Sequence, residues 1–155
     1  MKDPDNTPQP PNTLRFVCIS DTHSLHRHLS PLLPKGDVLL HAGDFTNNGR
    51  PEDVKSLSVW PAGVDYKHKI VIAGNHDLTF DRDSYPRLWR RFRHPEMYNC
   101  EQTRQLLQHC TYLEDESIEI DGIVIYGAPH QPQFCDWAFN RERGEELRRE
   151  WEKIP

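Results

Sequence analysis

The sequence has few features that would hold a structure together covalently or through thiolate-bound metal. Its four cysteines are scattered and include no Cys-x-x-Cys pair, which argues against a thiolate zinc site and against a disulfide framework. Cys18 lies inside an apolar run, where we expect a small buried hydrophobic side chain.

Long apolar runs and excess positive charge are also absent. No run approaches the ~20 apolar residues that cross a bilayer, and the opening residues MKDPDNTPQPPN lack the apolar stretch of a secretory signal. We therefore expect a cytoplasmic protein with no membrane partner. The net charge of −5 argues against a nucleic-acid polymer as partner. The basic run at 87–93 is interpreted as a solvated helix face, with attraction of an anionic substrate as the alternative.

The chain divides into a proline-rich tail at 1–13, predicted to be disordered, and a single domain at 14–155. Within the domain, compact apolar runs predict strands that are covered on both faces. These runs occupy 14–20, 37–43, 69–74 and 123–129.

Helices are expected between and after these strands, at 51–60, 84–92, 100–110 and 141–155. In the last of them, Leu147, Trp151 and Ile154 form an apolar stripe suited to docking onto a sheet. Asp121-Gly122 between two β-type runs predicts a hairpin over 116–126. This alternation predicts an α/β fold with a mixed sheet.

Polar side chains follow three of the predicted strands. Asp21 and His23 follow the first strand, Asp44 the second, and Asn75 and His76 the third. Ligands of open α/β sheets bind beyond the carboxyl ends of the strands, so we expect these side chains to converge. Carboxylate, imidazole and amide donors together suit Mn²⁺, Fe or Zn²⁺.

The motifs D-T-H, G-D and G-N-H-D, in this order after successive strands, resemble those of the calcineurin-like metallophosphoesterases. The flanking segments RFVCISDTHS, GDVLLHAGDFT, KIVIAGNHDLTFD and YGAPHQPQFCDWAFNR are similar to the metallophosphoesterase-domain-containing (MPPED) subgroup, from about residue 14 to the end. The resemblance implies a metallophosphoesterase-type β-sandwich flanked by helices.

The resemblance also implies roles for the site residues. Asp21 and His23 would bind the first metal, Asp44 would bridge to a second, and Asn75 would bind the second. His76 would act on the phosphate as general acid or stabiliser, oriented by a neighbour such as Asp77. The implied activity is hydrolysis of small phosphomonoesters or phosphodiesters, including cyclic nucleotides, by hydroxide attack at two divalent ions (Mn, Fe or Zn).

The family's later histidine motifs have no counterpart here, because no histidine follows His130. We therefore expect a C-terminally truncated domain with one weakly bound metal ion, impaired hydrolysis, and an exposed sheet edge open to self-association. The alternative is a catalytically silent module that binds metal, nucleotide or a partner.

Other aromatic and histidine side chains are not expected to bind metal. His41 is expected to be a hydrogen-bonded neighbour of the site, and His26 and His28 to be exposed in a polar loop. His130 could contact substrate, and Trp137 is favoured as a core residue over a cleft wall.

Overall fold

A four-stranded parallel sheet forms the centre of the computed structural model, which describes residues 8–155. The strands pair in the order β1-β2-β3-β4. Their bounds are β1 Phe16–Ile19, β2 Val38–His41, β3 His68–Val71 and β4 Thr111–Tyr112. Ile19, His41 and Val71 lie side by side in the register, so the first three strands end at the same edge. The first three apolar runs are therefore confirmed as neighbouring strands, and β4 is an addition.

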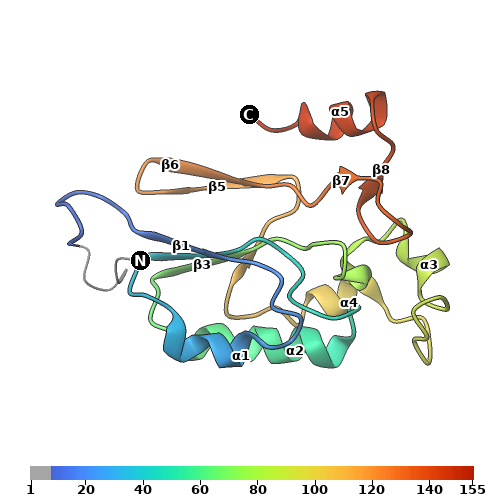
Figure 1. Cartoon of the computed structure of the whole chain (residues 1–155), viewed down its shortest axis with the longest axis horizontal. Coiled ribbons are helices and arrows are strands. Elements are labelled where there is room, and N and C mark those ends of the chain that lie inside the picture. Colours follow the sequence, from blue (N-terminus) through green and yellow to red (C-terminus); the bar gives the residue numbers. More distant parts are fainter. Residues whose placement is uncertain (1–7) are drawn as a thin grey trace.

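Short helices cover one face of this sheet. Figure 1 shows α1 (His26–Leu29) and α2 (Pro51–Val59) on the side opposite the β5–β6 hairpin. The larger core lies on this side and includes Val17 and Leu39 of the sheet. Further short elements complete the region, namely 3-10 turns at Ser30–Leu32, Trp60–Gly63 and Leu78–Phe80 and helices α3 (Tyr85–Leu88) and α4 (Cys100–Arg104).

The predicted hairpin packs on the opposite face and gives the sandwich its second layer. It consists of β5 (Glu116–Ile120) and β6 (Ile123–Gly127), joined by Asp121 and Gly122 with φ angles of 48° and 82°. Two positive φ angles at the corner are typical of a type I′ turn. The hairpin forms a separate sheet, so the expectation of one mixed sheet is corrected to a parallel sheet and an antiparallel hairpin that pack on each other, with a small third sheet of β7 and β8.

Both faces of the central strands are buried, as their continuous apolar sequence predicts. Successive side chains of a strand point to opposite faces. Accordingly Leu39 belongs to the core on the helical side, whereas Val38 packs with Leu113 and Ile120 beneath the hairpin. The β-sandwich flanked by helices is thus confirmed.

Cys18 shows where this coverage ends. β1 lies at the edge of the sheet, and Cys18 is exposed there, contrary to the expected burial. Among the described residues no strand pairs with the outer edge of β1. Self-association through a sheet edge stays a prediction.

The C-terminal segment contains β7 (Gln131–Pro132), β8 (Asn140–Arg141) and α5 (Glu145–Trp151). The predicted apolar stripe of α5 is only partly buried. Leu147 is 5% exposed, whereas Trp151 is 47% and Ile154 46% exposed. The helix ends at Trp151, so Ile154 leaves the helical register, and the Trp151 indole N–H instead donates to the carbonyl of His130 at 3.2 Å.

Helices α3 and α4 are shorter than predicted because the chain after each leaves the α-helical hydrogen-bond pattern, in a wider turn after α3 and a tighter turn after α4. After α3, Arg93 takes a φ of 55° and the His94 N–H donates to the carbonyl of Trp89. After α4, Leu106 bonds back to Thr103, three residues earlier, in the manner of a 3-10 turn.

The N-terminal tail is described only in part. Residues 1–7 of the segment predicted to be disordered lie outside the described residues, and 8–13 contain no helix or strand. Gln9 nevertheless donates to the carboxylate of Asp37 at 2.8 Å. No helix within 8–155 has the length and apolar character needed to cross a membrane.

Two histidines are buried between the sheet and the helices. His26 begins α1 and is fully buried against Trp60, at 5.4 Å between ring centroids, so its expected exposure is wrong. His41 ends β2 and shares a hydrogen bond of 2.8 Å with the Thr22 hydroxyl, as expected for a hydrogen-bonded neighbour of the site. Burial, followed by the nearby His26, lowers the pKa of His41 to about 4, although Asp21 acts in the opposite direction.

His41 should make stability depend on pH. Its pKa lies below the ordinary 6.5, so unfolding takes up a proton and stability falls as the pH drops from 6.5 toward 4. Between about pH 7 and about pH 4.5 the free energy of unfolding should fall in both proteins. We expect the fall to be about 2 kcal/mol smaller for His41→Gln than for the wild type. Denaturant titrations at both pH values measure this.

The exposed His28 supplies a matched control, because His28→Gln removes a histidine from α1 without touching the buried pair. Its pH profile should parallel that of the wild type. Parallel profiles for His41→Gln and wild type would show that His41 is not held neutral by burial.

Candidate metal centre

Three loops meet at the carboxyl edge of the sheet. They follow β1, β2 and β3, whose last residues are aligned in the register. Backbone hydrogen bonds join the first two loops, from the Asp21 N–H to the carbonyl of Gly43 at 3.0 Å and from the His23 N–H to the carbonyl of Asp44 at 3.0 Å. The third loop is joined to the second through the His76 N–H, which donates to Asp44 Oδ1 at 2.8 Å. The loops are therefore fixed relative to one another by main-chain groups.

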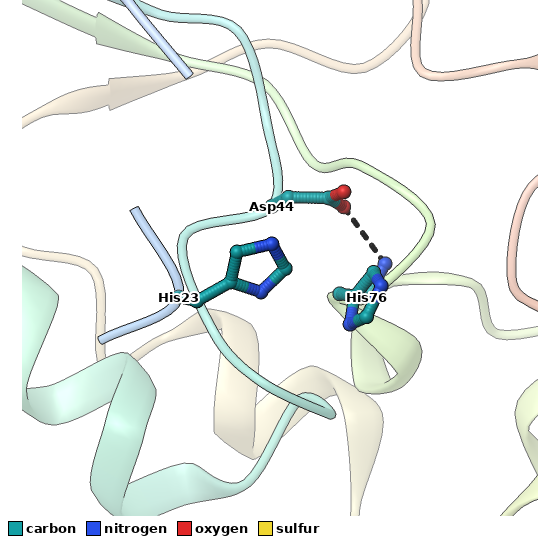
Figure 2. Close-up of side chains that lie close together, drawn as sticks. All are labelled: His23, Asp44 and His76. Atoms are coloured by element: carbon teal, nitrogen blue, oxygen red, sulfur yellow. Dashed lines mark hydrogen bonds between the residues drawn. The ribbon is translucent and has the colours of Figure 1, made fainter. Parts of the chain in front are cut away.

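His23, Asp44 and His76 bring their side chains together at this meeting point. One ligand atom of each lies within 4.8 Å of the others, and all three residues are half-buried. Figure 2 shows the three side chains around a common space, each coming from a different loop. The rings of His23 and His76 meet edge to face with centroids 4.5 Å apart.

The backbone at these positions is strained. Asp21, His23 and Asp44 have φ angles of 52°, 40° and 54°. Left-handed backbone is uncommon for residues other than glycine, and such strain gathers at functional sites. Its repetition at three predicted ligands supports a shared role for these loops.

Gly74 leaves room for the Asp44 carboxylate. A Cβ on Gly74 would lie 2.3 Å from Asp44 Oδ1 and 2.6 Å from the Asp44 nitrogen. Gly43 approaches from the other side with a φ of 97°, a conformation that suits glycine. The glycines of the G-D and G-N-H-D motifs are therefore required by the close approach of two loops.

Asp21 and Asn75, the other predicted metal ligands, lie in the same loops. Asp21 is exposed and stands outside the three-residue group. Asn75 is half-buried, and its carbonyl accepts from the Ala138 N–H at 3.3 Å. Their assignment as ligands stays a prediction.

His76 is oriented by two groups that the motifs do not reveal. Its Nδ1 lies 2.8 Å from the carbonyl oxygen of Asn47. A carbonyl only accepts, so Nδ1 carries the proton and Nε2 offers its lone pair, or a proton when the ring is charged. The indole of Trp137 stacks on the same ring at 3.9 Å between centroids and 29° between planes. Trp137 is half-buried and packs against the larger core, as favoured from the sequence, and its ring also faces His76.

The Trp137 loop is held in place by the basic run at 87–93. Asp136 forms ion pairs with Arg87 and, at 3.2 Å, with Arg91, while Phe92 contacts the Trp137 ring at 4.5 Å. The run is thus not only a solvated helix face, because part of it fixes the wall beside His76.

Asp77, predicted to orient His76, is fully buried and bonds elsewhere. Its carboxylate accepts from Thr46 N–H (2.9 Å) and hydroxyl (2.7 Å), from Gly74 N–H (2.9 Å) and from Phe45 N–H (3.4 Å). Burial raises the pKa of Asp77 to about 7, although these hydrogen bonds oppose the rise. Asp77 therefore holds the second loop against the third. The group that orients the His76 ring is instead the Asn47 carbonyl.

This arrangement fits a divalent cation. A carboxylate and two imidazoles are close enough to share one ion, and a mixed oxygen and nitrogen set is typical of Zn²⁺, Mn²⁺ or Fe. The missing side chain of Gly74 lets the Asp44 carboxylate lie against the third loop, beside His76. His130 lies in a separate cluster with Asp115 and Glu150.

Comparison with known proteins agrees with this geometry. The family model described as "Calcineurin-like phosphoesterase" matches residues 14–153. The chain is 44% identical to metallophosphoesterase domain-containing protein 1 of Homo sapiens and of Mus musculus over 160 residues, which cover 98% of the chain and 48% of each relative. It is 42% identical to a UPF0046 protein of Caenorhabditis elegans over 150 residues, covering 97% of the chain and 53% of the relative.

The chain thus spans about half the length of the curated relatives it matches. The match includes all three loops of the metal centre, and their order along the chain is the one that the motifs predict. The chain belongs to the calcineurin-like phosphoesterase family.

Proposed function

We propose that this chain is a metal-dependent hydrolase of small phosphomonoesters or phosphodiesters, cyclic nucleotides among them. The observation that carries the proposal is the convergence of His23, Asp44 and His76 from three loops at one sheet edge. Family membership supports hydrolysis of phosphoesters in general.

Each side chain of the centre has a role in this proposal. Asp21, His23 and Asp44 would hold the first cation, and Asn75 follows in the third loop. His76 keeps its Nε2 toward the substrate because Nδ1 is engaged by the Asn47 carbonyl, and from there it gives a proton to the leaving oxygen. A bound divalent ion supplies Lewis-acid stabilisation of the phosphoryl oxygens.

A second ion belongs to the same proposal and would be held by Asp44, shared with the first ion, and by Asn75. Two protein ligands hold such an ion only weakly, so the expected state of this chain is one ion bound well enough to measure. Hydrolysis should then be slow compared with a centre that holds two ions.

A silent binding module is the second candidate function. It is favoured by the size of the cluster, because the described residues place only three ligating His and Asp side chains together at this edge. Such a module would bind Mn²⁺ or a nucleotide phosphate without turnover. Calorimetry with Mn²⁺, together with hydrolysis of a chromogenic phosphodiester, separates the two candidates.

Asp44→Asn should abolish both metal binding and hydrolysis. The amide still offers an oxygen to the His76 N–H but lacks the charge that attracts the ion. We expect the affinity for Mn²⁺ to fall at least ~100-fold, since even indirect partners of metal ligands are worth about 10- to 100-fold. Calorimetric titration and the phosphodiester assay measure the two effects.

Asp65→Asn is the matched control, because Asp65 is exposed and precedes β3, whereas the third motif follows that strand. It should leave both readouts unchanged. Mn²⁺ binding without hydrolysis in the wild type would select the silent module, and equal binding by wild type and Asp44→Asn would overturn both candidates.

Trp137→Leu should slow hydrolysis without weakening metal binding. Loss of the stacked indole frees the His76 ring, and misplacement of a catalytic group by about 1 Å can cost about 100-fold in rate. We expect kcat to fall roughly 10- to 100-fold with KM and Mn²⁺ affinity nearly constant, and Trp137→Phe to restore much of the rate.

Phe134→Ala tests the same loop without touching His76, because Phe134 is 67% exposed. It should behave as the wild type. A rate loss in Phe134→Ala equal to that in Trp137→Leu would mean that loop stability, rather than the stacked ring, is being measured.

A further inference from the structure

A second group of ligating side chains lies apart from the metal centre. It consists of Asp115, His130 and Glu150, whose ligand atoms all lie within 4.8 Å of one another. Asp115 stands just before β5, His130 just before β7, and Glu150 on α5. Figure 1 shows α5 on the outer side of the hairpin, away from α1 and α2.

The imidazole of His130 is aimed at both carboxylates. Its Nε2 lies 3.3 Å from Asp115 Oδ2 and 3.3 Å from Glu150 Oε2. The His130 side chain is only 8% exposed, so the ring is held in this position by burial. Its Nδ1 is buried with no hydrogen-bond partner within 8–155, and the same holds for Asp115 Oδ1. Among the described residues Asp115 Oδ1 is therefore an unused ligand atom of the cluster, whereas Glu150 Oε1 pairs with Arg141 at 3.4 Å.

A positive charge already occupies the middle of this cluster. The Lys153 ammonium lies 3.0 Å from Asp115 Oδ2 and also contacts Glu150 Oε2. The Lys153 side chain is 48% exposed, so it can turn into solvent without breaking a core contact. The two carboxylates therefore already attract a cation at this point, and the Lys153 ammonium is free to leave it while Arg141 stays paired with Glu150.

Beside the cluster is a polar cavity of about 430 Å³, which leaves room for water ligands on a bound ion.

We propose that Asp115, His130 and Glu150 form a second divalent-cation site that takes Zn²⁺, with the Lys153 ammonium in its place when the metal is absent. One imidazole and two carboxylates suit Zn²⁺ better than Mg²⁺ or Ca²⁺, which prefer oxygen ligands alone. The ion would link α5 to the residues that precede β5 and β7. The site is independent of phosphoester hydrolysis.

The test uses the full chain carrying Asp44→Asn, which removes the first centre from the titration. Calorimetry with Zn²⁺ should give one ion per chain. Adding Glu150→Gln should weaken this binding at least ~10-fold. Adding Lys153→Met should strengthen it roughly tenfold, because the competing charge is gone. The visible absorption of Co²⁺ in the same variants reports oxygen and nitrogen ligation.

Two control substitutions remove the same kinds of charge at positions outside the cluster. Glu119→Gln on the exposed side of β5 and Lys55→Met on α2 should leave Zn²⁺ affinity unchanged. Absence of saturable Zn²⁺ binding, equal affinity with and without Glu150→Gln, or weaker binding in Lys153→Met each overturns the site. If Glu150→Gln unfolds the chain, the higher Zn²⁺ affinity expected of Lys153→Met still tests the site. The rise in melting temperature of the chain on adding Zn²⁺ tests it as well.

Discussion

The metal centre depends on the buried carboxylate of Asp77. It lies between the second and third loops and receives hydrogen bonds from both, through Thr46 on one side and Gly74 on the other. Burying an ionised carboxylate is costly unless donors surround it, and here main-chain and hydroxyl groups of the two loops provide them. Because the same loops carry Asp44 and His76, the bracing that stabilises Asp77 also sets the spacing of the proposed ligand and acid.

Most of the sheet and the meeting of the loops follow from local sequence. Apolar runs without alternation predicted strands buried on two faces, and the parallel register then aligned the loops after β1, β2 and β3. The Asp121-Gly122 corner was predictable because few other dipeptides accept two positive φ angles. The contacts of His76 were not predictable, because the Asn47 carbonyl and the Trp137 ring come from distant loops. His26 was misjudged for the same reason, since Trp60 buries it.

The segment from His130 to β8 connects the two cation sites in this account. Trp137 stacks on His76 at the first site, and His130 points into the second, with Phe139 packed edge to face on the His130 ring at 5.9 Å. The Ala138 N–H reaches the carbonyl of Asn75, so the segment is joined to the third loop by its main chain as well. The same segment therefore contributes one side chain to each cluster.

Anomalous diffraction from crystals of the chain grown with Mn²⁺ tests the central claim most directly. The account predicts a strong peak in the space enclosed by His23, Asp44 and His76, within bonding distance of the Asp44 carboxylate and a His23 nitrogen. A chain that binds Mn²⁺ in solution but shows no peak between these loops, or shows its only peak elsewhere, would contradict it.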